Sequence, residues 1–135
     1  MMPGVPEGWK GCWIPDVEAA GATLPEFLAT PGKHVVFWSA AVELVIWDPW
    51  MAMGIDWLVV AGEAGRDARP FCQDWLRTAI KSGSRRNVPV FIAQMGSNCV
   101  THFGNRICHR HYSGGKITEW APEYRVRQYP SLPSA

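Results

Sequence analysis

Four short apolar segments recur along the chain, and they constrain the fold more than any other feature of the sequence. They lie at residues 9–14, 34–39, 56–61 and 88–93. Within the third segment, residues 57–61 are apolar in succession, without the alternation of a strand that has one face in water. Such runs are typical of strands covered on both faces, which occur mostly in parallel sheets. The sequence therefore predicts a parallel sheet.

Helical or turn-rich segments separate these strands. Residues 22–29 carry apolar side chains at helical spacing, and residues 73–82 do the same and stop at Gly83, a common residue at helix C-termini. Residues 44–53 are ambiguous because Pro49 interrupts them. Alternating strands and helices predict an α/β fold with right-handed crossovers. We expect either a partial (half) β/α barrel or a small open sheet of about four to five mainly parallel strands.

The last part of the chain has a different character. After Gly96, several glycines and prolines break the sequence into short pieces, so we expect an irregular C-terminal segment. We predict one α/β domain over residues 1–130 and a disordered tail over residues 131–135. A chain of 135 residues is long enough to bury roughly two thirds of the surface that it exposes when unfolded.

Composition excludes several classes of partner. The 13 basic and 12 acidic residues give a formal charge of +1, so no net positive field favours a nucleic acid or a membrane surface. No apolar run approaches the roughly 18–20 residues of a membrane-spanning helix. The N-terminus lacks the pattern of a signal peptide, so we expect a cytoplasmic protein whose four cysteines are reduced. The eight tryptophans are expected mainly in the core.

The segment after the third strand is the strongest candidate for a ligand site. Gly62 begins a loop of about ten residues before the helix near Gln73, whereas loops after parallel strands usually take about 2–6 residues. Ligands of parallel α/β sheets bind at the carboxyl ends of the strands. A long, glycine-rich and charged loop at such an end therefore predicts a binding site.

Five polar side chains at these strand ends are the candidate ligand-binding residues. Asp16, Glu63 and Gln94 follow the first, third and last strands. Arg66 and Arg69 lie in the long loop, where a guanidinium can hold a carboxylate or phosphate through two parallel hydrogen bonds. The alternative is an internal ion pair between Glu63 and Arg69 that only orders the loop. The sequence leaves both interpretations open.

Four side chains that can bind zinc lie close together in the sequence, at Cys99, His102, Cys108 and His111. Five residues separate the two pairs, whereas structural zinc sites usually separate theirs by about a dozen. The alternative is a surface hairpin with half-buried cysteines, and we assign neither a metal nor another cofactor. Residues 47–50 (WDPW) are expected to form a turn with packed indoles, because no basic residues flank them as in a base-stacking platform.

Three blocks of the sequence carry a resemblance to a known family. They are IDWLVVAGEAGRDARP at 55–70, NVPVFIAQMG at 87–96 and GKITEWAPEYRVRQYP at 115–130. In this order they resemble the C-terminal half of the phage-borne three-cysteine-motif proteins, a radical-SAM-like and largely uncharacterised family of mobile elements. The resemblance implies a (β/α) barrel whose N-terminal half carries a Cys-x3-Cys-x2-Cys motif for an iron–sulfur cluster. No such spacing occurs among the cysteines of this sequence, so we expect neither the cluster nor cleavage of S-adenosylmethionine from it alone.

The sequence also departs from that family at three strand ends. Pro15 and Ala41 stand where relatives have glutamates, and Ala93 stands where they have a lysine. Glu63, Arg69 and Gln94 persist. The resemblance therefore implies a retained fold with lost chemistry.

Two classes of function follow. The first is a non-catalytic interaction or small-ligand-binding module that takes a small anionic ligand and forms a homodimer, because a half barrel has two unpaired sheet edges. Residues 107–112 are an alternative cover for one edge. The second is a small-molecule enzyme in which Glu63 is the general acid or base, with Arg66, Arg69 and Gln94 positioning an anionic or amide substrate. Assembly with a separate chain that supplies the cysteine half is a third possibility.

Overall fold

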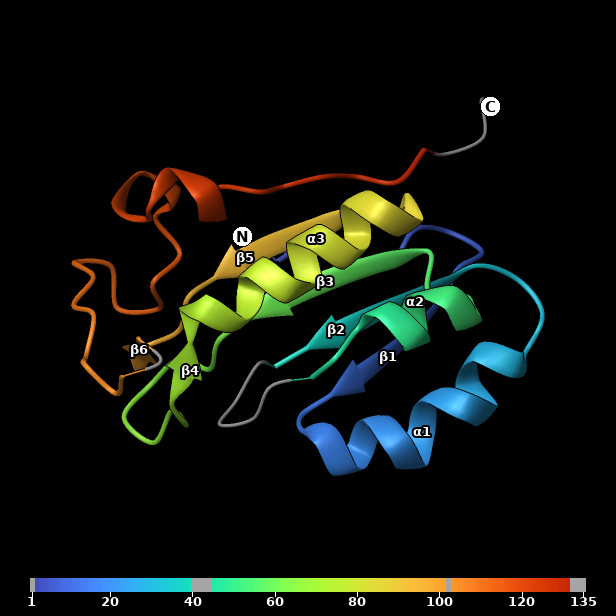
Figure 1. Cartoon of the computed structure of the whole chain (residues 1–135), viewed down its shortest axis with the longest axis horizontal. Coiled ribbons are helices and arrows are strands. Elements are labelled where there is room, and N and C mark those ends of the chain that lie inside the picture. Colours follow the sequence, from blue (N-terminus) through green and yellow to red (C-terminus); the bar gives the residue numbers. More distant parts are fainter. Residues whose placement is uncertain (1, 40–44, 102, 132–135) are drawn as a thin grey trace.

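The four apolar segments form the four strands of one parallel sheet (Figure 1). The computed structural model describes residues 2–39, 45–101 and 103–131. The strands are β1 (Lys10–Ile14), β2 (His34–Trp38), β3 (Trp57–Ala61) and β5 (Val90–Gln94). They lie in the order β1-β2-β3-β5, and every neighbouring pair is parallel. The predicted α/β fold with a parallel sheet is confirmed.

Within the described residues, the three α-helices cover the same face of this sheet. They are α1 (Val17–Ala29), α2 (Asp48–Met53) and α3 (Leu76–Arg86), the last preceded by the short 3-10 helix η1 (Gln73–Trp75). Figure 1 shows α2 and α3 in front of the strands and α1 alongside β1, and side chains of α1, α2 and α3 share one core cluster with the same face of the strands. The order of the strands in the sheet follows their order in the chain, so successive right-handed crossovers return on the same side. This one-sided arrangement also occurs in each half of a β/α barrel.

Helix α1 begins five residues earlier than the predicted residue 22. The side chain of Asp16 accepts a hydrogen bond from the backbone N–H of Ala19 at 2.7 Å and so caps the first turn. Gly21 and Pro25, both unfavourable inside helices, conceal this start in the sequence. Asp16 therefore begins a helix, in addition to lying at a strand end.

Helix α3 does not end at Gly83, and that prediction is wrong. The helix continues to Arg86 and ends at Asn87, whose φ of 56° is the left-handed conformation of a helix C-terminus. Gly83 is buried inside the helix, where an added Cβ would lie 2.7 Å from both the carbonyl oxygen of Val88 and the side chain of Val90. This glycine permits close packing of the helix on the next strand, and its carbonyl oxygen accepts the backbone N–H groups of Asn87 and Val88 that close the helix.

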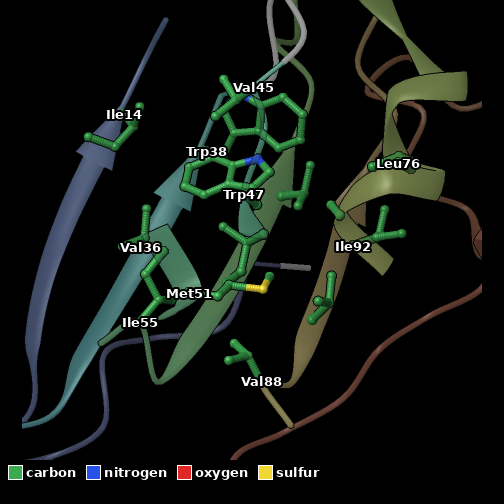
Figure 2. Packing of buried hydrophobic residues seen from close by; sticks show 14 of the residues in the cluster. Ile14, Val36, Trp38, Val45, Trp47, Met51, Ile55, Leu76, Val88 and Ile92 are labelled. Carbon is green, nitrogen blue, oxygen red and sulfur yellow. The ribbon is translucent and has the colours of Figure 1, made fainter. Parts of the chain in front are cut away.

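The core between the sheet and the helices contains most of the large apolar side chains. Figure 2 shows Trp38 and Trp47 side by side at one end of this layer, with ring centroids 5.4 Å apart. Met51 of α2 reaches the sheet in the same layer. Trp47 is fully buried next to the short helix α2, so the predicted packing of an indole at residues 47–50 is confirmed, but a helix replaces the expected turn.

The other face of the sheet carries a smaller apolar cluster. Its members come from β2, β3 and β5 and are Val35, Phe37, Trp57, Val59, Ala61, Phe91 and Ala93. The two ends of the chain contact this face. Trp57 donates its indole N–H to the carbonyl oxygen of Gln128 at 2.9 Å, and Tyr129 packs edge-on against Phe91. Trp9, from the N-terminal segment, packs on the same cluster.

The C-terminal segment also covers one edge of the sheet. The N–H of Ile92 donates to the carbonyl oxygen of Val126, and the N–H of Gln128 donates to that of Val90, both at 2.9 Å. An antiparallel bridge joins Phe91 to Arg127 between them. The suggestion that residues 107–112 cover an edge of this sheet is wrong, because residues 126–128 occupy the β5 edge. The β1 edge has no paired segment among the described residues.

A second, two-stranded parallel sheet was not predicted. It pairs β4 (Phe71–Cys72), at the end of the long loop, with β6 (Cys99–Val100). After β6 the chain turns back tightly, since the N–H of Ile107 donates to the carbonyl oxygen of Cys99 at 2.8 Å. This turn explains why residues 107–112 are not available to the main sheet. Two-residue strands have no period that a sequence pattern can reveal.

The described residues include no helix with the length and apolar character needed to cross a membrane. Some sequence expectations fall on residues that the structure does not describe. These residues are 132–135 of the expected tail, Ala41, and the first residue of the ambiguous segment 44–53.

Candidate functional site

The long loop after β3 borders an open cavity at the carboxyl ends of the strands. The cavity has a volume of about 640 Å³. Its walls come from the N-terminal segment, the ends of the four strands of the main sheet and the loop, and they include Met2, Trp13, Ser39, Gly62, Glu63, Arg66, Asp67 and Gln94. Of the five predicted ligand-binding residues, Glu63, Arg66 and Gln94 therefore line the same cavity.

Glu63 and Arg69 form an ion pair within the loop. The Arg69 Nε lies 3.0 Å and 2.9 Å from the two carboxylate oxygens of Glu63, and its Nη2 lies 2.6 Å from Oε2. The backbone N–H of Arg69 donates to Oε1 at 2.9 Å. The same Nη2 donates to the carbonyl oxygen of Pro15 at 3.1 Å, which ties the loop to the end of β1. Both charges of this ion pair therefore have partners within the protein.

The ion pair also fixes the protonation state of its carboxylate. The hydrogen bonds from the Arg69 side chain lower the pKa of Glu63 below its ordinary value, against the opposing effect of burial. The same contacts raise the pKa of Arg69. Both groups are therefore charged at neutral pH. A general acid needs the opposite shift, because it must hold a proton at the pH at which it acts.

Asp16 and Gln94 also have structural partners. Asp16 caps α1, as described above, and its charge contributes to the raised pKa of Arg69. The side-chain amide of Gln94 donates to the carbonyl oxygen of Gly62 at 2.8 Å, and the N–H of Gly62 donates back to the Gln94 carbonyl at 2.9 Å. The pairing of β3 with β5 skips Ala93 just before this point, a bulge that places Gln94 opposite Ala61. Gln94 thus holds the start of the loop while lining the cavity.

Glycines bring the loop into contact with the segment after β5. A Cβ on Gly62 would lie 2.3 Å from the carbonyl oxygen of Met95. Gly96 has a φ of 84°, and a Cβ there would lie 2.8 Å from the carbonyl oxygen of Glu63. The N–H of Ser97 donates to that oxygen at 2.8 Å. The start of the loop is therefore held by backbone contacts that no larger residue allows.

Trp13 and Ser39 belong to the cavity, and sequence reasoning missed both. The indole of Trp13 stacks on Phe37, with centroids 5.5 Å apart and planes at 13°, and its N–H donates to the hydroxyl of Ser39. About half of the Trp13 side chain remains exposed, at 52%. Their position in the sequence could have identified them, because both residues lie at or next to the carboxyl ends of the first two strands.

Arg66 differs from the other predicted residues. Within the described parts of the chain, its guanidinium has no hydrogen-bond or ion-pair partner, although Arg69 three residues later has several. Arg66 is exposed and lines the cavity. It is the loop cation that remains available to a ligand.

Three of the four zinc candidates lie within the described residues, in different surroundings. Cys99 is buried in β6, where desolvation raises the pKa of its thiol to about 12. Cys108 is exposed, and Nδ1 of His111 lies 2.8 Å from the hydroxyl of Ser113. His102 lies outside the described residues. Among the residues that the structure describes, no three His, Cys, Asp or Glu side chains are placed to hold a metal ion. The chain does turn back after β6, but the half-buried cysteines of the alternative are not found, because Cys99 is buried and Cys108 is exposed.

Fold and site together define a small α/β domain with helices on one face and a ligand-sized cavity at its strand ends. The chain belongs to a family described as protein of unknown function (DUF5131), whose model matches residues 2–122. The matched region includes every strand and the entire long loop. No curated protein and no solved structure matches the chain.

Proposed function

We propose that this protein is a non-catalytic module that binds a small anionic ligand in the cavity next to the loop at residues 62–70. The proposal depends on one observation: of the two arginines in the loop, one is paired with a carboxylate and the other is not. Arg69 is neutralised by Glu63, whereas Arg66 faces the same region without a partner among the described residues. A positive group left unpaired at the carboxyl ends of parallel strands is placed where such folds bind ligands.

The geometry of Glu63 favours binding over catalysis. Both of its carboxylate oxygens accept hydrogen bonds from Arg69, and its pKa is lowered. A general base with these contacts would have to break them to reach a substrate proton, and a general acid would lack the proton. The two functions make different predictions for Glu63→Gln. The enzyme alternative predicts a lower catalytic rate, whereas our proposal predicts only a loss of stability.

The lining of the cavity indicates the shape of the ligand. The exposed indole of Trp13 offers a flat apolar surface, and the guanidinium of Arg66 offers a positive charge with several donors. The lining also includes the small residues Ala61 and Gly62, which leave room for a ring. A flat ring that carries an anionic group fits these three features.

Descent from a radical-SAM-like barrel of mobile elements is part of the same proposal. The resemblance of the three sequence blocks supports it, and so does a parallel sheet with all helices on one face. Two of the strand-end positions singled out by that resemblance carry no polar side chain within the described residues: the carbonyl oxygen of Pro15 accepts a hydrogen bond from Arg69, and Ala93 is buried. Loss of the polar groups at these positions fits a role without catalysis.

We also propose a homodimer formed through β1. In contrast to β2 and β3, whose residues are all buried, β1 is mostly exposed, and its outer edge has no partner among the described residues. An open strand edge favours pairing with another strand. Because residues 126–128 cover the β5 edge, the second copy is expected at β1 alone. Sedimentation and native mass spectrometry should detect a dimer, and a monomer, or a complex only with an iron–sulfur protein, would contradict it.

Benzoate is a suitable probe of the ligand site, because it is a flat ring with one carboxylate. NMR titration should shift the indole N–H of Trp13, and Arg66→Ala should weaken binding about tenfold, the effect of one charge-assisted hydrogen bond. Arg85→Ala is the matched control, since Arg85 is exposed on α3 and lies 3.5 Å from Asp48 in a surface ion pair. Equal binding by both variants, or no shift at Trp13, would overturn the proposal.

A further inference from the structure

A second cavity lies on the other side of the long loop. Its volume is about 540 Å³. In Figure 1 the green loop after β3 and the orange segment after β6 lie together beyond the ends of the strands. The cavity lies between them and is lined by Gly65, Arg66, Ala68, Ser97, Asn98, Arg106, His109 and Tyr112.

We propose that this second cavity binds a phosphate group, and that the phosphate belongs to a small molecule whose ring occupies the first cavity. The placement of the ring in the first cavity rests on the proposed function above. The phosphate site itself depends on separate residues, chiefly Arg106 and His109.

The charge of the cavity carries the proposal. Its described lining contains two arginines and a histidine and no Asp or Glu. Neither Arg66 nor Arg106 has a hydrogen-bond or ion-pair partner for its guanidinium within the described residues. Other arginines of the protein are engaged, such as Arg77 with Glu123 at 2.8 Å and Arg86 with Asp48 at 2.9 Å. Two unpaired guanidiniums facing one cavity favour a multiply charged anion, and phosphate accepts their paired N–H donors.

The walls of the cavity are held in place by hydrogen bonds. The hydroxyl of Ser97 accepts from the N–H of Gly65 at 2.8 Å and donates to the carbonyl oxygen of Tyr112 at 2.5 Å, so one side chain links both walls. The amide of Asn98 donates to the carbonyl oxygen of Ala68 at 3.2 Å. A site with fixed walls loses less conformational entropy when a ligand binds.

His109 adds a neutral donor beside the two guanidiniums. Burial lowers the pKa of its imidazole, and the charge of Glu119 opposes this effect. Glu119 is itself occupied, because its carboxylate accepts hydrogen bonds from the N–H groups of Arg110 and His111 at 2.8 and 3.1 Å. The imidazole can therefore donate a hydrogen bond to a phosphate oxygen without first releasing a carboxylate partner.

Arg66 connects the two cavities, because it lines both. A ligand with its ring near Trp13 and its phosphate between Arg66 and Arg106 would use both sides of the loop. Each cavity has the volume of a small-molecule site. The net charge of +1 gives no overall positive field that would attract a polyanionic polymer. The observations therefore favour a small phosphorylated molecule over a nucleic acid.

Calorimetry with inorganic phosphate, benzoate and phenyl phosphate tests each part separately. We expect phenyl phosphate to bind at least about tenfold more tightly than benzoate, and Arg106→Gln to weaken phenyl phosphate and phosphate about tenfold while leaving benzoate unchanged. Arg110→Gln is the control: Arg110 is exposed nearby but does not line the cavity. Unfolding curves of both variants establish that they fold.

The outcomes separate the two proposals. If phosphate binds and depends on Arg106 but benzoate does not bind, the phosphate site stands and the proposed ring site is overturned. If benzoate binds and phenyl phosphate binds no more tightly, or if Arg106→Gln and Arg110→Gln behave alike, the phosphate site is overturned. Tighter binding of a single-stranded oligonucleotide than of phenyl phosphate would overturn the small-molecule assignment.

Discussion

The base and the tip of the long loop have opposite surroundings. The loop base, defined as Gly62, Glu63 and Arg69, is held by an ion pair, by close backbone contacts and by a hydrogen bond to the end of β1. The loop tip, residues 64–68, is largely exposed and presents Arg66 to two cavities. Charged residues that look equivalent in the sequence thus have different roles. In our proposal, the base determines the shape of the site and the tip binds the ligand.

The largest expected effect is at the base. Gly62→Ala places a Cβ 2.3 Å from the carbonyl oxygen of Met95, so backbone must move, and we expect a loss of about 3 kcal/mol or more in the free energy of unfolding. Urea denaturation measures it. Gly21→Ala is the control, because a Cβ in that helical position meets nothing within 4 Å and should stabilise by about 0.5–1 kcal/mol. If Gly62→Ala and Gly21→Ala changed the free energy of unfolding equally, the close backbone contact at Gly62 would have no special importance.

Acid titration tests the ion pair of the base. The lowered pKa of Glu63 means that the folded protein binds this proton more weakly than the unfolded chain. The stabilisation is therefore complete above the ordinary pKa of 4.5 and is lost as the pH falls through the lower folded value. Glu63→Gln should cost about 1–3 kcal/mol at neutral pH.

The same variant should also show a weaker loss of stability between neutral pH and acid than the unmodified protein. Unfolding curves at several pH values provide the comparison. Parallel pH profiles for the two proteins would show that the ion pair contributes nothing.

A smaller effect is expected at Asp16, a predicted ligand residue that the structure uses as a helix cap. Asp16→Ala removes the hydrogen bond to Ala19 and should cost about 1 kcal/mol of stability. Benzoate affinity should not change. Glu18→Ala, in the first turn of the same helix, should cost only a few tenths of a kcal/mol. A loss of affinity in Asp16→Ala without a loss of stability would instead assign Asp16 to the ligand.

Most of the fold could be predicted from the sequence, because the buried parallel strands β2, β3 and β5 leave nearly continuous apolar runs. The failures occurred where a residue has two possible roles. Gly83 resembles a helix C-terminus but serves close packing, and Asp16 resembles a site residue but caps a helix. The bridge between Phe91 and Arg127 joins residues far apart in the chain, and no local pattern encodes such a contact.

The sequence indicated where the cavity lies, but it did not indicate which charged side chains of the loop are paired. The length and charge of the loop located the cavity, yet the sequence offered Arg66 and Arg69 as equal candidates. The ion pair with Glu63 depends on the three-dimensional course of the loop. Arg106 and His109 were missed because a tight turn after β6 brings them to the loop only in the folded chain.

Binding and stability measured together for Arg66→Ala and Arg69→Ala test the central claim most directly. We predict that Arg66→Ala lowers benzoate affinity about tenfold and changes the free energy of unfolding by less than about 0.5 kcal/mol. Arg69→Ala should destabilise the protein by about 1–3 kcal/mol, because it leaves the Glu63 carboxylate without its partner. If Arg66→Ala binds benzoate normally, or if Arg69→Ala leaves stability unchanged and abolishes binding, the division between loop base and loop tip is contradicted.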